Sequence, residues 1–123
     1  MLHRLRLVVS ALLLTACAHS TGTDAAPSSG TVEVRVSNQN ALPMEVLASG
    51  SGINHRLGTV HPGMSGSFVI PQNLVGNGSV QFEARASGGG GQPFRSGQVM
   101  LAPGSLIEFQ IAAQLFNSTV VRR

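Results

Sequence analysis

Short segments in which apolar and polar residues alternate one by one constrain this chain most strongly. The clearest are residues 32–36, 80–85 and 107–111, where Val, Ile, Phe or Ala occupies every second position and Glu, Gln or Arg lies between. Successive side chains of a β-strand point to opposite faces of its sheet, so a period of two predicts strands with one buried and one solvated face. Residues 31–123 contain no segment with the period of an amphipathic helix. We therefore expect an all-β domain.

Glycine, proline and asparagine separate these segments from weaker strand candidates. The weaker candidates are residues 44–48, 56–60, 67–70, 98–101 and 117–122. Pro-Gly pairs at 62–63 and 103–104 are typical of type II turns, residues 71–78 leave room for one helical turn, and Gly88–Gly91 reads as a loop tip. Seven to eight strands recurring every 8 to 13 residues predict a single small antiparallel β-sandwich. A small β-barrel is the alternative.

The expected sandwich has the size of immunoglobulin-like and transthyretin-like domains, but it lacks the Cys and Trp that mark antibody domains. Charged side chains at Glu33, Arg35, Glu83, Arg85 and Glu108 alternate with apolar ones and should lie on the outer faces. The inward positions form the expected core, which consists of Val32, Val34, Val36, Val46, Leu57, Phe68, Ile70, Val80, Phe82, Val99, Leu101, Ile107, Phe109 and Ile111.

The first residues of the chain follow a different pattern. Arg4 and Arg6 precede the apolar run Leu7–Leu14, which only Ser10 interrupts. About eight apolar residues are too few to span a bilayer, which takes roughly 20. A basic start followed by a short apolar run is typical of a secretory signal peptide. We expect residues 1–16 to form a signal helix that is cleaved on export.

The apolar run ends in Leu14-Thr15-Ala16-Cys17, which resembles the lipobox of bacterial lipoprotein precursors. The resemblance covers residues 1–17. It implies that Cys17 carries diacylglycerol, with palmitate-type chains, and that signal peptidase cuts between Ala16 and Cys17. A lone Cys in an exported chain has no intramolecular disulfide partner, which agrees with this use of the thiol. The alternative is a soluble secreted chain, because Ala16-Cys17-Ala18 also fits ordinary signal cleavage.

Three parts of the chain follow from this pattern. Residues 17–30 are small and polar, which predicts a lipidated Cys17 followed by a flexible, disordered tether. Residues 31–123 form the β-sandwich domain. Ala18 stands where lipoproteins retained in the inner membrane of diderm bacteria often have Asp. The resemblance therefore implies a lipid-anchored protein of the cell envelope, with a leaning toward the outer membrane.

The formal charge of +3 overstates how basic the exported chain is. Without Arg4 and Arg6, six arginines face five acidic residues, and the arginines are spread along the chain apart from the final pair. A nucleic-acid-binding surface needs a clustered basic face. The sequence also has no Trp or Tyr to stack on bases or sugars. We expect no nucleic-acid partner.

Side chains that carry catalysis or bind metals are few and scattered. The only Asp, Asp24, lies in the expected tether, so we expect no Ser-His-Asp triad. His55 and His61 lie about 20 Å apart on an extended strand, which is too far to share a metal ion. We therefore expect no enzymatic activity, no catalytic residue, no cofactor and no metal site.

Two groups of apolar residues lie outside the alternating segments. Met44, Met64 and Met100 are expected to fill gaps in the core, as flexible methionines often do. Leu115-Phe116, close to the C-terminal end, is expected to pack in the core as well. The alternative for this pair is an exposed apolar contact.

The anchor, the tether and a strand-rich domain poor in catalytic groups together predict a protein-interaction or adaptor module. Cys17 would hold the chain on a membrane, and loops or an edge strand would bind another envelope protein. One alternative is a structural or assembly subunit of an envelope complex. The other is a secreted small-ligand carrier.

Overall fold

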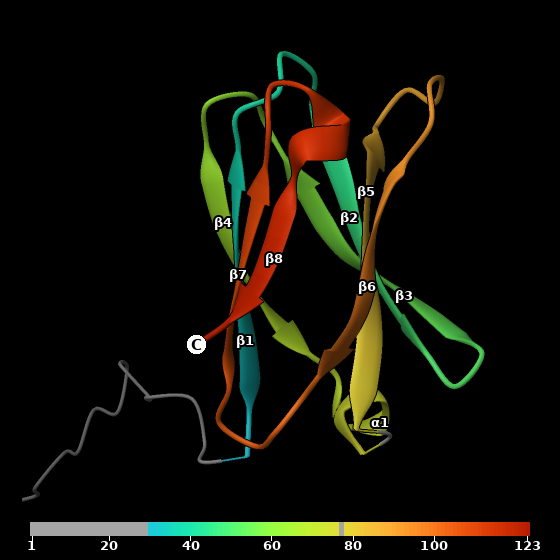
Figure 1. The fold of residues 1–123 in the computed structure, drawn as a ribbon, viewed down its shortest axis with the longest axis vertical. Coiled ribbons are helices and arrows are strands. Elements are labelled where there is room, and N and C mark those ends of the chain that lie inside the picture. Colours follow the sequence, from blue (N-terminus) through green and yellow to red (C-terminus); the bar gives the residue numbers. More distant parts are fainter. Residues whose placement is uncertain (1–29, 77) are drawn as a thin grey trace, which may run out of the picture.

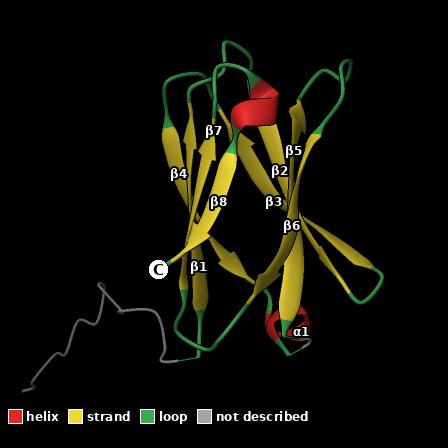
Figure 2. Cartoon of the chain, viewed as in Figure 1, coloured by secondary structure: helices red, strands yellow, loops and turns green. Residues whose placement is uncertain are grey.

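The computed structural model describes residues 30–76 and 78–123, in which eight strands form two packed sheets (Figure 1, Figure 2). The first sheet contains, in order, β4 (Ser65–Ile70), β1 (Val32–Asn38), β7 (Leu106–Ile111) and β8 (Thr119–Arg122). The second sheet contains, in order, β3 (Ile53–Val60), β2 (Met44–Gly50), β5 (Ser79–Ala86) and β6 (Phe94–Met100). The predicted β-sandwich is confirmed. The barrel alternative is wrong, because the described strands form two separate open sheets.

The three clearest alternating segments become interior strands of the two sheets. β1 and β7 are neighbours in the first sheet and pair in parallel, whereas the other neighbouring strands in both sheets pair antiparallel. β5 is an interior strand of the second sheet. These three strands pack one face on the core and leave the other face to solvent, which makes their alternation regular. In β2, the fourth interior strand, Leu47 is buried between Val46 and Ala48 and breaks the alternation.

Most of the expected core is buried as predicted. Leu57, Phe68 and Val99 are only partly buried, but they pack against the core. Phe109 lies at the centre, with its ring centroid 6.2 Å from that of Phe82 and 5.8 Å from that of Phe94. Met44 is buried, as expected of a methionine that fills the core, and the buried apolar residues that lie outside the expected core are Leu47, Ala48, Val60, Leu74, Val75 and Ala84. Two of these lie on the single helical turn α1 (Gln72–Val75), which falls within the predicted range 71–78.

The predicted tight turns are confirmed. At residues 61–64 the Met64 N–H donates to the His61 carbonyl at 3.1 Å, and Gly63 adopts a φ of 72°. At residues 102–105 the Ser105 N–H donates to the Ala102 carbonyl at 3.0 Å, and Gly104 adopts a φ of 81°. A type II turn requires positive φ at its third position, and glycine adopts it without steric cost.

Every strand differs from its predicted limits by at least one residue, and the differences at β6 and β8 have a clear structural cause. β6 begins at Phe94 rather than at Gln98. The prediction missed the first part of the strand because Ser96 lies where the register of its pairing with β5 shifts. The Ser96 hydroxyl accepts a hydrogen bond from the Phe82 N–H at 2.9 Å, and the extra residue breaks the alternation that reveals a strand. The last strand begins at Thr119 rather than at Asn117, because residues Leu115–Asn117 form a 3₁₀ helix, η1.

The predictions for residues 1–16 and for Cys17 and the tether lie outside the described residues, except for Gly30. Within residues 30–76 and 78–123, no helix has the length and apolar character needed to cross a bilayer.

Candidate functional site

Four connections gather at one end of the sandwich, which we call the loop end. It consists of residues 39–43, 61–64, 87–93 and 112–118, which join β1 to β2, β3 to β4, β5 to β6 and β7 to β8. Figure 1 shows these connections together at the top, whereas β1 begins at the bottom, the end where α1 also lies. The loop end is therefore the part of the domain farthest from the point where the chain enters it.

Asn38, at the end of β1, holds two connections of the loop end in place. Its side chain is 1% exposed. The amide Nδ2 donates to the Leu42 carbonyl at 2.9 Å and to the Val60 carbonyl at 2.8 Å, and Oδ1 accepts from the Asn40 N–H at 2.8 Å. Both amide protons and the amide oxygen are therefore used. A buried, fully paired polar group specifies a unique local structure, because leaving any of its bonds unmade is costly.

Asn40 ties the first connection to the fourth. Its Nδ2 donates to the Ala113 carbonyl at 3.1 Å, and its Oδ1 accepts from the Leu42 N–H at 3.0 Å. The fourth connection is fixed in turn by Ser118, whose hydroxyl accepts from the Ala112 N–H at 3.0 Å. The backbone around Leu42 is thus held from both sides, and so is the segment that carries η1.

The loop end presents large apolar side chains and no formal charge. Leu42 is 54% exposed, Met64 58% and Phe116 76%. None of the residues of the loop end is Asp, Glu, Lys or Arg. The three side chains lie on three different connections of this end. Exposed apolar residues are typical of a protein interaction site where they form one patch, whereas residues scattered singly need no explanation.

Two predictions about these residues need correction. Leu115 packs against the core as expected, but Phe116 points to solvent, so the pair divides between the two uses considered for it. The 3₁₀ geometry of η1 places neighbouring side chains on different sides. Met44 is buried as expected, whereas Met64 and Met100 are exposed. Met64 lies in the turn at residues 61–64, and Met100 lies on the outer side of the edge strand β6.

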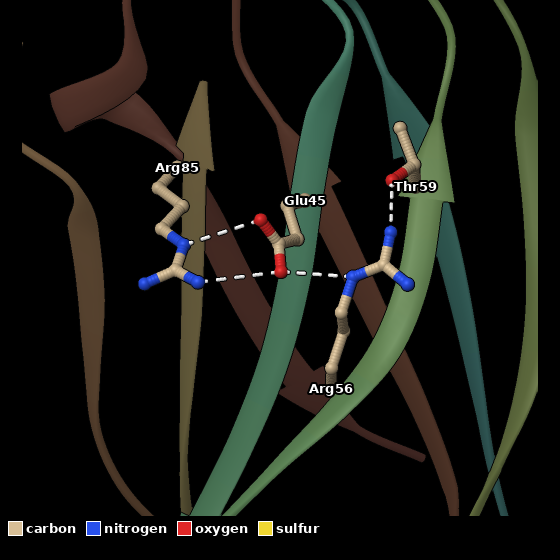
Figure 3. A network of polar contacts seen from close by, with 4 residues as sticks. All are labelled: Glu45, Arg56, Thr59 and Arg85. Atoms are coloured by element: carbon tan, nitrogen blue, oxygen red, sulfur yellow. Dashed lines mark hydrogen bonds and ion pairs between the residues drawn. The ribbon is translucent and has the colours of Figure 1, made fainter. Parts of the chain in front are cut away.

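The outer face of the second sheet carries a different feature, a row of ion pairs. Glu45 on β2 lies between Arg56 on β3 and Arg85 on β5 (Figure 3). Its carboxylate is 2.8 Å from Arg56 Nε and accepts two hydrogen bonds of 3.3 Å from Arg85. The hydrogen bond from Arg85 is the main cause that holds the pKa of Glu45 below its ordinary value, with the charges of Arg85 and Arg56 adding to it. Pairing with Glu45 raises the pKa of Arg85.

We expect the contribution of Glu45 to stability to depend on pH. A carboxyl whose pKa is lowered by folding stabilises the folded state above its ordinary pKa of 4.5, and this contribution is lost as the pH falls through the lowered value. Glu45→Gln should therefore lower the urea midpoint at pH 7, and the difference from the parent should shrink toward pH 3.

Glu33→Gln is the matched control, because Glu33 is bound by one exposed arginine, Arg35, at 3.0 Å. Its effect at pH 7 should be the smaller of the two, since exposed single pairs contribute little. Urea denaturation followed by circular dichroism at both pH values provides the comparison. An undiminished difference for Glu45→Gln at pH 3 would contradict the assignment.

The described residues show no converging set of catalytic or metal-binding groups. In residues 30–76 and 78–123, no three His, Cys, Asp or Glu side chains gather where they could hold a metal ion. His55 lies on β3 and His61 in the turn that follows it. Two open hollows lie on the surface of the described residues. One of about 380 Å³ lies over β4, β1 and β7, and one of about 450 Å³ lies beside the β2–β3 hairpin.

The predicted site residues Ala16 and Cys17 lie outside the described residues, so the structure does not place them. Sequence reasoning missed Asn38 and Asn40 as the residues that organise the loop end. The signal was present, because asparagine at the end of a strand followed by another two residues later is typical of turns in which the side chain bonds the backbone. Their wider bonds to Val60 and Ala113 depend on the tertiary fold.

Comparison with known proteins leaves the family of the chain open. No protein-family model matches it, and no curated protein is similar to it. Among solved structures, an NMR structure of a protein from Eubacterium rectale is similar, at 16% sequence identity and a TM-score of 0.47. The match covers 79% of this chain and 92% of that one.

Proposed function

We propose that this chain is a lipid-anchored protein of a bacterial envelope, held on its membrane through Cys17, and that its β-sandwich binds an envelope protein through the loop end. The observation that carries the proposal is the position of the loop end. An uncharged surface with Leu42, Met64 and Phe116 exposed lies opposite the point where the chain enters the domain. A domain tethered at its entry end presents that surface to its surroundings.

The sequence supports the anchor. Leu14-Thr15-Ala16-Cys17 closes a short apolar run, and Cys17 is the only cysteine of the chain. A lipoprotein with two or three acyl chains is held stably on a membrane, whereas a protein with a single acyl chain binds a membrane only marginally. The expected tether, residues 18–30, would then provide the reach, since a flexible segment of this length spans on the order of 20 Å.

The rigidity of the loop end supports binding of a protein. Asn38 and Asn40 fix the backbone that carries Leu42, so little conformational freedom is lost when a partner covers it. Phe116 supplies the kind of large apolar side chain that dominates many interfaces. The lack of formal charge at the loop end favours a partner surface that is itself uncharged and apolar, since unpaired charges are costly to bury.

Site-specific photocrosslinking in native envelope membranes tests this function. We expect a photoreactive side chain at position 116 to give one discrete adduct with another protein. The same group at position 54, an exposed site on β3, should give none. The double substitution Leu42→Ser and Met64→Ser should abolish the adduct at position 116, because it removes apolar contact area while leaving the core intact.

Cys17→Ser tests the anchor in the same membranes. The substituted chain should move from the membrane fraction to the soluble fraction and lose labelling by radioactive palmitate. A chain that stays in the membrane fraction after Cys17→Ser contradicts the anchor. Equal adducts at positions 116 and 54 contradict the role of the loop end.

A further inference from the structure

The two sheets have four edge strands, and three of them are protected against pairing with another chain. β3 carries Arg56 and a register shift in its pairing with β2, and β6 carries Arg95 and a register shift in its pairing with β5. β8 has only four residues and ends in Arg122, whose Nη1 donates to the Met100 carbonyl of β6 at 3.3 Å. Charged residues, bulges and short length are the means by which native proteins prevent edge strands from associating.

β4 has none of these protections. Its six residues, Ser-Gly-Ser-Phe-Val-Ile, include no charge and no proline, and their register along β1 is unbroken from Val32↔Ile70 to Ser37↔Ser65. No other strand of the described residues pairs with its outer edge. Val69 on this strand is 57% exposed. Only Pro71, directly after the strand, limits how far pairing can extend.

The backbone groups that β4 turns outward can be assigned from its hydrogen bonds. The Asn38 N–H donates to the Met64 carbonyl at 2.9 Å, which starts a series of bonded pairs that continues two residues at a time along the register. Consistent with this, the Glu33 N–H donates to Ser105 on the other side of β1. Gly66, Phe68 and Ile70 therefore bond β1, and the N–H and C=O groups of Ser65, Ser67 and Val69 point away from the sheet.

We propose that β4 pairs with β4 of a second copy of this chain, antiparallel and about a two-fold axis at Ser67. In this register Ser67 faces Ser67 of the second copy, and Ser65 faces Val69. Each of these facing pairs exchanges two backbone hydrogen bonds, so all the outward groups are satisfied. The two first sheets then form one continuous sheet with an isologous interface.

The side chains of β4 are compatible with this register on both faces. On the inner face, Gly66 lies opposite Phe68 of the second copy, and the Phe68 ring of each copy already packs over Gly66 of its own strand. On the outer face the paired residues are Ser and Val, with no like charges opposed. The nearest charges, Glu33 and Arg35 on β1, already bond each other at 3.0 Å. Because the pairing is antiparallel, the two loop ends point in opposite directions.

A disulfide at the axis tests the pairing. In the full chain carrying Cys17→Ser, Ser67→Cys introduces the only thiol. Bonded partners in antiparallel strands have Cα atoms about 5.5 Å apart, which suits a disulfide. We expect Ser67→Cys to form a linked dimer at least about tenfold faster than Thr119→Cys, whose side chain lies at an exposed position on the edge strand β8.

The register gives a second readout. Copies with Ser65→Cys and copies with Val69→Cys should link to each other when mixed. Ser65→Cys alone should not, because its two copies lie about 14 Å apart in the proposed pair. Equal linking rates at positions 67 and 119, or self-linking of Ser65→Cys as fast as the mixed reaction, would overturn the proposal.

Introducing a charge at the axis provides a test that needs no covalent bond. Ser67 is exposed and its neighbour on β1 is Arg35, so Ser67→Glu should leave the fold intact while placing two carboxylates opposite each other in the pair. In sedimentation velocity of the Cys17→Ser chain at high concentration, we expect dimers for the parent, and monomers for Ser67→Glu and for Ser67→Arg. An equimolar mixture of the two variants should form dimers again.

A parent that sediments only as a monomer, or a mixture that stays monomeric, contradicts the pairing. These measurements use the purified chain without membrane or partner. Their outcome is therefore independent of the proposed role of the loop end and of the anchor.

Discussion

Asn38→Asp is expected to lower the free energy of unfolding by about 3 kcal/mol at pH 7. The substitution keeps the shape of the side chain but replaces its amide by a carboxylate. Two carbonyl oxygens, of Leu42 at 2.9 Å and of Val60 at 2.8 Å, would then face an oxygen atom instead of two N–H groups. Asn38 is 1% exposed, so water cannot compensate for the lost bonds. The loss should be smaller at pH 4, where a protonated carboxyl can still donate one hydrogen bond.

Asn54→Asp is the matched control for this substitution, because it makes the same chemical change at an exposed position on β3. Its effect should stay within about 0.5 kcal/mol. Urea denaturation of both variants measures the difference. Equal effects at the two positions would show that the network around Asn38 does not stabilise the loop end. If a folded Asn38→Asp chain still gave the photocrosslink at position 116, partner binding would not depend on the loop geometry that Asn38 maintains.

Phe109→Ala is expected to destabilise the domain by about 3–5 kcal/mol. Phe109 is 1% exposed and lies between the rings of Phe82 and Phe94, at centroid distances of 6.2 and 5.8 Å. Phe82 and Phe94 come from the second sheet, whereas Phe109 comes from the first, so its ring bridges the two layers. Removing it leaves a cavity that the paired strands cannot collapse to fill, because their backbone hydrogen bonds fix the spacing of the layers.

Phe116→Ala makes the same change at a side chain that is 76% exposed. Its effect on the free energy of unfolding should lie within about 0.5 kcal/mol, even though it removes a residue of the proposed binding surface. Chemical denaturation of the two variants provides the comparison. A small effect for Phe109→Ala would mean that the core can repack around the missing ring.

The sequence predicted three of the four interior strands well, because the pattern that reveals them is local. In β1, β5 and β7 a single period of two reports both the strand and the buried face, and the charged residues Glu33 and Arg35 mark the outer side. The turns at Gly63 and Gly104 were predictable for the same reason, since their φ angles restrict the residue type at one position.

The candidate site was much less predictable, because it depends on contacts between distant parts of the chain. Phe116 and Leu115 are adjacent and similarly apolar, and only the packing of η1 decides which one is buried. The Ser96 hydroxyl takes the place of a backbone acceptor inside β6. The alternation of apolar and polar residues is broken there, so the pattern did not reveal the first half of the strand. The exposure of β4 as an edge follows from strand order, which no local pattern in its six residues encodes. The lipid anchor at Cys17 rests on the sequence resemblance and remains a prediction.

The parallel pairing of β1 with β7 has a consequence for the order in which the domain folds during synthesis. Residue 33 pairs with residue 106 and residue 38 with residue 111, so the first sheet cannot be completed until most of the chain has been made. At synthesis rates of roughly 5–20 residues per second, β7 follows β1 after roughly 4–15 s. Pairings between distant segments are also slow to form. The second sheet and the β1–β4 pair contain only segments that precede β7, so they can form first, and the first sheet is completed last.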